Sequence, residues 1–235
     1  MLLYVVRHGD PDYELDSLTE LGKKQAAALA KRLAFHGLDK IYTSPLGRAK
    51  LTAEPTCRAL GIEPQVLDWT SENTAYSEFS VEREGGGREW SFASVRNTEY
   101  MTKAEALGER WYEVPPFTKC RAKEGYERIV RESDAFLESL GYKRDGDVYR
   151  IVRPNDDRVA VFCHYGFGTT WLSHLLSLSP ARMWGTFLIN HSSFTVLRFP
   201  NDKEGYVSPQ CLALSDCSHL FAAGLPVNYE NWINY

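Results

Sequence analysis

The chain has 235 residues, 43% of them hydrophobic and 25% charged, a composition typical of a globular protein with a sizeable core. Its formal net charge of -4 at pH 7 argues against a nucleic-acid partner, because general nucleic-acid binders normally carry a basic patch. No apolar run approaches the roughly 20 residues of a membrane span, and the N-terminal apolar run is too short for a signal peptide. We therefore expect a cytoplasmic protein that binds neither nucleic acid nor membranes.

The first half of the chain alternates strand and helix patterns, over residues 2–6, 18–35, 38–43 and 46–60. Thr19 is the expected N-cap of the first helix, and Gly37 is its expected stop. Pro55 lies inside the second helical pattern and predicts a kink or an early end there. Strands that alternate with helices in this way predict parallel pairing through right-handed crossovers.

From about residue 66 to residue 121 the periodicity disappears, although the segment is rich in aromatic side chains. A long segment of this kind inside a compact protein is usually functional or disordered, and the aromatic side chains favour order. We predict one domain over residues 1–235, with a cap-like insertion at about 68–121 that lies over the sheet edge and shapes a pocket. Trp69, Trp90 and Phe92 are the insertion residues expected to face the ligand.

Regular patterns return in the second half, as a helix, two strands, a second helix and two edge strands over residues 122–140, 148–152, 158–163, 171–178, 194–199 and 211–215. The first two of these strands flank the turn-forming residues 153–157 and predict a hairpin. The whole order of elements predicts an α/β fold. We expect a three-layer sandwich, with a mostly parallel central sheet flanked by helices.

The cysteines are scattered and lack the C-x-x-C spacing of a zinc or redox site: Cys57, Cys120, Cys163, Cys211 and Cys217. This pattern indicates reduced thiols rather than a disulfide framework. Cys163 stands next to His164, but adjacent residues of a strand point to opposite faces. We interpret Cys163 as a packed strand residue and not as a nucleophile.

Two predicted strands end in a histidine and a glycine turn, in V-V-R-H-G and V-F-C-H-Y-G, and a third ends in Y-T-S-P-L-G-R. If these strands are parallel neighbours, their polar ends meet at the sheet edge where open α/β sheets bind ligands. The side chains brought together are Arg7, His8, Arg48 and His164. Two guanidinium groups and two imidazoles around one point suit a phosphoryl group, because guanidinium forks bind phosphate oxygens bidentately.

The chain resembles the histidine phosphatase superfamily, the phosphoglycerate-mutase-like fold, in an ordered set of motifs. They are R-H-G at 7–9, L-T-x-x-G at 18–22, S-P-L-x-R at 44–48, the strand-His-x-Gly ending at 166, and a His-Leu pair at 219–220. The resemblance implies that His8 forms a phosphohistidine intermediate. Arg7 and Arg48 would then grip the phosphate, and His164 would complete the pocket. Further expected substrate-binding residues of these motifs are Gly9, Ser44 and Gly166, and the scheme needs no metal and no cofactor.

A general acid must protonate the leaving oxygen and then activate water, which requires a carboxyl group with a pKa near the working pH. In the family this group is a glutamate after the third strand, and Glu72 in V-L-D-W-T-S-E stands at that position. Glu78 and Glu82 are alternatives, and Asp10 is a weaker one.

The Arg-His-Tyr-Gly run that follows this glutamate in the mutases of the family is absent, which favours transfer to water. We predict a metal-independent phosphomonoesterase acting on a small phosphorylated metabolite. A phosphoglycerate-type mutase and a non-catalytic phospholigand-binding protein are the alternatives.

The remaining histidines are expected to be structural: His36, His174, His191 and His219. Three insertion arginines are candidates to meet a second anionic group of the substrate: Arg83, Arg88 and Arg96.

Overall fold

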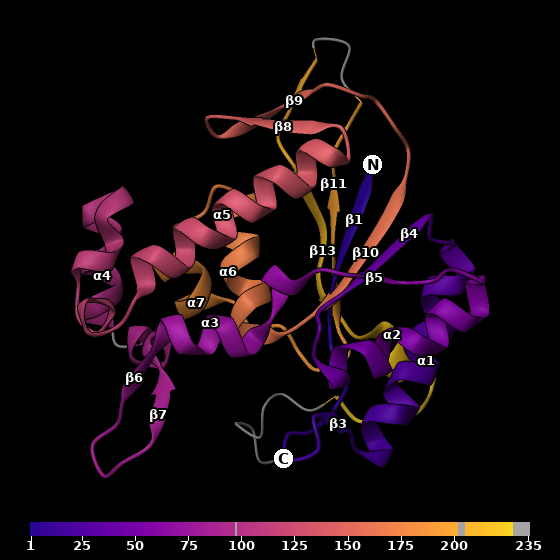
Figure 1. Ribbon diagram of the computed structural model, residues 1–235, viewed down its shortest axis with the longest axis horizontal. Coiled ribbons are helices and arrows are strands. Elements are labelled where there is room, and N and C mark those ends of the chain that lie inside the picture. Colours follow the sequence, from indigo (N-terminus) through magenta and orange to yellow (C-terminus); the bar gives the residue numbers. More distant parts are fainter. Residues whose placement is uncertain (97, 202–204, 228–235) are drawn as a thin grey trace.

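A six-stranded sheet forms the centre of the computed structural model, which describes residues 1–96, 98–201 and 205–227, with side chains except at 94–96 and 98. Its strand order is β13-β11-β1-β10-β4-β5 (Figure 1). The strands are β1 (Leu2–Arg7), β4 (Lys40–Thr43), β5 (Gln65–Val66), β10 (Arg158–Cys163), β11 (Phe194–Arg198) and β13 (Gln210–Asp216). The four strands β1, β10, β4 and β5 run parallel, while β11 and β13 are antiparallel. The predicted mostly parallel sheet is confirmed.

Helices cover both faces of the sheet, because alternate residues of the buried strands are apolar on both sides. Along β1, Leu3 and Val5 belong to one hydrophobic cluster, while Tyr4 and Val6 belong to the other. One face carries α1 (Glu20–His36) and α2 (Gly47–Leu60), and the other carries α3, α5, α6 and α7 (Figure 1). The bounds of these four helices are Glu72–Phe79, Ala122–Ser139, Tyr165–Leu175 and Pro180–Thr186. The three-layer α/β prediction is therefore confirmed.

The limits of α1 follow from the predicted capping residues. The hydroxyl of Thr19 accepts a hydrogen bond from Gly22 N, and Gly37 ends the helix with a φ of 74°. In α2, by contrast, the predicted early end at Pro55 is wrong, since the helix continues to Leu60. An interior proline costs about 3 kcal/mol, and the burial of Ala53 and Cys57 on either side of it offsets that cost.

The predicted hairpin between residues 148–152 and 158–163 is wrong. Strand β9 (Val148–Ile151) pairs instead with β8 (Tyr142–Asp145) across the two-residue turn Gly146-Asp147, and on its other side with β12 (Tyr206–Val207). Strand β10 is inserted between β1 and β4, so both of its edges are already paired in the central sheet.

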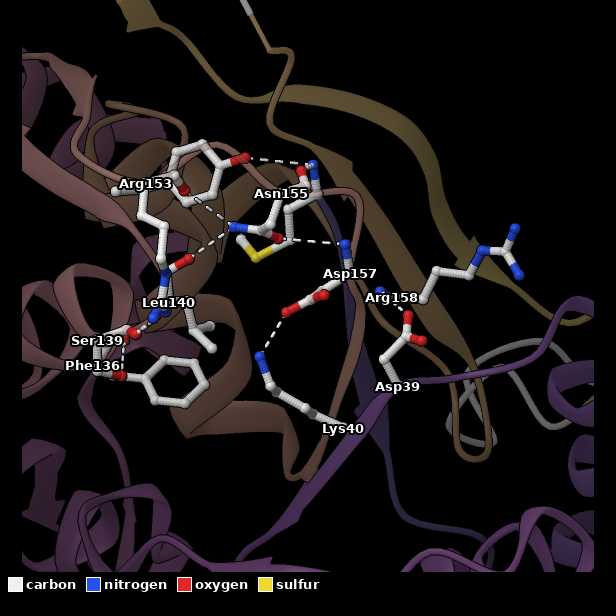
Figure 2. A network of polar contacts seen from close by, with 11 residues as sticks. Asp39, Lys40, Phe136, Ser139, Leu140, Arg153, Asn155, Asp157 and Arg158 are labelled. Carbon is white, nitrogen blue, oxygen red and sulfur yellow. Dashed lines mark hydrogen bonds and ion pairs between the residues drawn. The ribbon is translucent and has the colours of Figure 1, made fainter.

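The chain that links β9 to β10 is held by a polar network at the amino ends of the central strands (Figure 2). Asn155 Nδ2 donates to Leu140 O at 2.8 Å, and Asn155 Oδ1 accepts from Asp157 N at 3.2 Å. Lys40 on β4 forms an ion pair with Asp157. Residues 153–157 therefore direct the chain into the gap between two strands, instead of turning it back on its neighbour.

The predicted insertion contains more regular structure than its sequence indicates. It holds the 3-10 turns η1 (Asp68–Thr70), η2 (Ser91–Arg96), η3 (Gly108–Glu113) and η4 (Phe117–Lys119), the helices α3 and α4 (Thr98–Leu107), and the hairpin of β6 (Ser80–Glu82) and β7 (Arg88–Trp90). Its aromatic side chains pack on α7, where Phe92 stacks on Trp184 with ring centroids 5.1 Å apart. This packing orders a segment that lacks helical or strand periodicity.

Two smaller elements complete the description. The hairpin of β2 (Pro11–Asp12) and β3 (Ser17–Leu18) follows β1, and α8 (Ser218–Ala222) follows β13. Within the described residues, none of the helices combines the length and apolarity needed to cross a bilayer. All five cysteines are free thiols, and burial raises the pKa of Cys163, as expected for a packed strand residue.

Candidate active site

His8 lies at the carboxyl end of β1 and is 2% exposed. Its Nδ1 is 2.7 Å from the carbonyl oxygen of Gly9. Because a carbonyl oxygen can only accept, Nδ1 carries the proton and Nε2 keeps a lone pair. Burial, and then the neighbouring His164 and Arg7, lower the pKa of His8 well below 6.5. The imidazole is therefore neutral near pH 7 and can act as a nucleophile through Nε2.

Arg7 precedes His8 and is held by the loop that leads into β11. Its Nη1 donates to Ile189 O at 2.6 Å, and its Nη2 lies 2.6 Å from His191 Nε2. The guanidinium also lies over the ring of Tyr165, 5.1 Å from its centroid. His191, expected to be merely structural, is thus a neighbour of the site. The antiparallel pairing of β11 with β1, which places the start of β11 at the end of β1, is the signal that could have found it.

Arg48 comes from the first turn of α2 and is held by the loop between β2 and β3. Its Nη1 donates to Asp16 Oδ1 at 2.6 Å, while Asp16 Oδ2 accepts from Gly47 N at 2.6 Å. The ring of Tyr13 lies 5.4 Å from the guanidinium. Sequence reasoning did not identify Asp16, whose φ of 45° belongs to a tight loop without periodicity. The carboxylate of Asp16 both caps α2 and orients Arg48.

His164 follows β10 directly, and its ring centroid lies 5.2 Å from that of His8. Its Nε2 is 2.7 Å from Ser44 Oγ, an oxygen that also accepts from Leu46 N at 3.4 Å. A serine hydroxyl has one donor and two acceptor lone pairs, so Ser44 can donate to Nε2 while it accepts from Leu46, and His164 then carries its proton on Nδ1. That nitrogen is buried and has no hydrogen-bond partner among the described residues. It can donate to an oxygen of a bound phosphoryl group.

Glu72 begins α3, and its carboxylate sits at the amino end of α6. Its two oxygens accept from Gly166 N and Phe167 N, both at 2.8 Å. Burial raises the pKa of Glu72, and these hydrogen bonds oppose the rise without cancelling it. A carboxyl group with a raised pKa keeps its proton to a higher pH than a free glutamate, which suits a general acid.

The alternative carboxyl groups lie elsewhere. Glu78 forms a bidentate ion pair with Arg128, at 2.9 Å to Nε and 2.7 Å to Nη2. Asp10 accepts from the hydroxyl of Thr19 at 2.6 Å, and Glu82 lines a separate surface hollow. Among the described residues that line the site, Glu72 is the one carboxylate.

The site is a cleft of about 480 Å³. Its walls are formed by Arg7, His8, Tyr13, Arg48, Glu72, Asn73, Tyr76, Trp90, Phe92, Ala93 and Tyr165. Trp90 and Phe92 of the insertion stack with their centroids 4.8 Å apart and form part of the wall. Trp69 does not face the cleft as expected, because its ring packs in the core, 5.3 Å from Phe167 and 5.4 Å from Trp171.

The insertion arginines with described side chains point away from the cleft. Arg88 donates to the hydroxyl and the carbonyl oxygen of Ser80, and Arg83 lines the same separate hollow as Glu82. The side chain of Arg96 lies outside the described residues. Neither Arg83 nor Arg88 is therefore placed to meet a second anionic group.

Gly9, Ser44 and Gly166 are not among the described residues that line the cleft. Ser44 Oγ lies 2.7 Å from His164 Nε2, and Gly9 N donates to Thr52 Oγ1 at 3.0 Å. A Cβ added at Gly166 would lie 2.4 Å from the ring of Trp90, so only glycine lets that ring pack on the start of α6.

Gly166→Ala is expected to displace Trp90 and to disturb the amide that holds Glu72. Overpacking of this size costs about 1–3 kcal/mol in the free energy of unfolding, and we expect it to lower kcat/KM as well. Thermal unfolding and kinetics of the purified variant provide the measurement. Gly168→Ala is the matched control in the same helix, since the nearest atom to its Cβ would be the flexible end of the Ile189 side chain, at 3.3 Å, with Cys163 and Val5 at ordinary contact distances. Equal effects of the two changes would contradict this account of Gly166.

Comparison with known proteins agrees with this geometry. The sequence pattern of the histidine phosphatase superfamily (branch 1) matches residues 3–75, a range that includes Arg7, His8, Arg48 and Glu72. Over 204 residues the chain is 26% identical to phosphoserine phosphatase 1 of Hydrogenobacter thermophilus, covering 83% of this chain and 85% of that protein. The amino-terminal part of the chain thus matches the histidine phosphatase superfamily, and most of its length is similar to a phosphatase.

Solved structures of phosphatases share the fold of this chain. Phosphoserine phosphatase of Entamoeba histolytica, in complex with 3-phosphoglyceric acid, superposes with a TM-score of 0.61 at 20% identity, covering 93% of this chain and 98% of that one. A mycobacterial glucosyl-3-phosphoglycerate phosphatase superposes with a TM-score of 0.59 at 22% identity, covering 91% and 98%. At these identities the likeness shows the fold alone, because one fold can host many different activities.

Proposed function

We propose that this protein is a histidine phosphatase, which hydrolyses phosphomonoesters of small metabolites through a phosphohistidine formed on His8. The observation that carries the proposal is the neutral His8 ring, with its Nε2 lone pair available, in one cleft with two guanidinium groups and Glu72. Each of these groups has the chemical character that one step of the reaction requires.

In the first step, His8 Nε2 attacks phosphorus, and the bond from phosphorus to the ester oxygen breaks. Glu72 gives its proton to the departing alkoxide, so the product leaves as an alcohol. In the second step, a water molecule attacks phosphorus through its oxygen. The Glu72 carboxylate takes a proton from that water. The P–N bond breaks, inorganic phosphate leaves, and His8 and Glu72 return to their starting states.

The charge of the phosphoryl group is met by groups that are already in place. Arg7 and Arg48 neutralise the equatorial oxygens, and His164 Nδ1 donates to one of them. Because Asp16 and the 189–191 loop hold the two guanidiniums before substrate arrives, little reorganisation is needed at the moment of reaction. Two guanidiniums supply the charge that a metal ion would otherwise supply.

The remainder of the cleft favours hydrolysis of a substrate whose leaving group is organic and carries no second strong anion. Tyr76, Trp90 and Phe92 provide apolar ring surface, and the described lining residues include no cation besides Arg7 and Arg48. A phosphoglycerate-type mutase would need basic groups at both ends of a bisphosphate. We propose that residues 68–121 act as the cap that selects the leaving group.

A small phosphorylated molecule is accordingly the proposed partner, and the proposed compartment is the cytoplasm. The five free thiols support a reducing environment. The modest net charge of -4 supports local rather than global attraction of the anionic substrate.

A panel of phosphomonoesters tests this function. We expect release of inorganic phosphate from aryl and nucleoside-like phosphomonoesters, with higher kcat/KM than from 3-phosphoglycerate, and unchanged rates in the presence of a chelator. Transfer of the phosphoryl group from carbon 3 to carbon 2 of phosphoglycerate, without release of phosphate, would contradict the proposal in favour of a mutase. Phosphate binding without any turnover would favour the non-catalytic alternative.

A further inference from the structure

We infer that His191 is a positioning residue for Arg7, acting as the hydrogen-bond acceptor that fixes the plane of the phosphate-binding guanidinium. This inference rests on the proposed function, because it assigns Arg7 to the phosphoryl group. Two groups of one loop contact the two terminal nitrogens of Arg7: Ile189 O lies 2.6 Å from Nη1, and His191 Nε2 lies 2.6 Å from Nη2. With both ends of the fork held, the guanidinium cannot rotate freely about its long side chain.

The protonation state of His191 follows from its partner. A guanidinium has only donors and stays charged, so the nitrogen that faces it must accept. His191 is therefore neutral, with its proton on Nδ1. Burial, and then Arg7, lower the pKa of His191 to about 3, so the ring remains an acceptor throughout the working pH range.

The loop that carries His191 is itself fixed to the end of β1. Ser192 N donates to His8 O at 2.8 Å, and Arg7 N donates to Ser193 O at 2.9 Å. On the other side of His191, Asn190 donates to Ser215 Oγ from its backbone N at 2.9 Å and from Nδ2 at 3.1 Å. The acceptor is thus presented from a backbone that hydrogen bonds hold on both sides.

The position of the ring connects Arg7 with the nucleophile. The centroids of His191 and His8 are 5.4 Å apart, so a single short loop sets the guanidinium beside the attacking imidazole. Loss of a hydrogen bond to a charged group of this kind corresponds to a change of roughly 10- to 100-fold in affinity or rate. We expect that loss in phosphate affinity and in kcat/KM.

Two substitutions separate the acceptor from the bulk of the ring. His191→Phe keeps the ring and removes the acceptor, while His191→Gln places an amide oxygen where Nε2 stood. We expect His191→Phe to weaken inorganic phosphate binding, measured by calorimetry, and to lower kcat/KM, each by about 10- to 100-fold. His191→Gln is expected to restore most of both. His174→Phe is the control, since His174 is also buried but pairs with Asp134 outside the cleft.

A double-mutant cycle decides whether His191 acts through Arg7. In an Arg7→Ala background, His191→Phe is expected to change phosphate affinity and kcat/KM by less than about 2-fold, since its partner is gone. Additive losses, or a failure of His191→Gln to restore binding in a variant that melts like wild type, would overturn the inference.

The affinity measurement is independent of turnover. If phosphate binds with these couplings but no ester is hydrolysed, the proposed function alone is refuted. Failure of the wild type to bind phosphate would refute both.

Discussion

His8→Ala is expected to lower kcat for every phosphomonoester by on the order of 10⁴-fold or more, because it removes the nitrogen that forms the covalent intermediate. The guanidiniums of Arg7 and Arg48 remain, so inorganic phosphate should still bind. Steady-state kinetics and calorimetric phosphate titration of the variant give the two numbers.

The control for this substitution is His36→Ala, at the exposed end of α1, which is expected to leave kcat unchanged. Because His8 is buried, thermal unfolding of both variants shows whether the fold survives. A folded His8→Ala protein that retains phosphate binding and more than about a tenth of the wild-type kcat would exclude His8 as the nucleophile.

Glu72→Gln is expected to lower kcat/KM for alkyl phosphomonoesters by about 10²- to 10⁴-fold, the usual contribution of general acid catalysis. For p-nitrophenyl phosphate the same parameter should fall far less, because its leaving group needs no proton. The loss of the base for the second step should then appear as a burst of p-nitrophenol followed by slow turnover. Rapid-mixing absorbance measurements resolve the two phases.

The pH profile provides a second test of Glu72. As the acid, Glu72 must be protonated, so kcat/KM for alkyl esters should fall as the pH rises through its pKa, which burial has raised. The Glu72→Gln variant should lose this alkaline limb of the pH profile. The control variant Glu78→Gln should keep it. Glu78→Gln is expected to be less stable than the wild type, because it breaks the buried ion pair with Arg128. Equal kcat/KM losses for alkyl and aryl esters, with the limb intact, would argue against the role of Glu72.

Much of the site follows from the sequence because its parts sit at the ends of strongly apolar strands. Runs such as 2–6 and 158–163 are buried on both faces, and parallel strands bring their carboxyl ends to one edge. That single rule brings together Arg7, His8 and His164, and the helix start after β4 adds Arg48. The position of Glu72 came from the resemblance to the histidine phosphatases, since the segment around it has no period.

The remaining features depend on contacts between residues far apart in the chain. Whether 158–163 pairs with 148–151 or enters the central sheet depends on the edges offered by β1 and β4, which local turn signals cannot reveal. Asp16 and His191 act through arginines 32 and 184 positions away, so spacing gives no hint of them. The core position of Trp69 similarly follows from rings on α5 and α6 that only the fold brings near.

Trapping the intermediate tests the central claim most directly. The enzyme is mixed with a phosphomonoester for milliseconds and denatured under alkaline conditions, which preserve phosphohistidine, and the phosphate is located by peptide mass spectrometry. We predict phosphate on the imidazole of His8, at a level that rises in Glu72→Gln. Phosphate on another side chain, or turnover with no phosphorylated peptide in either protein, would contradict the account.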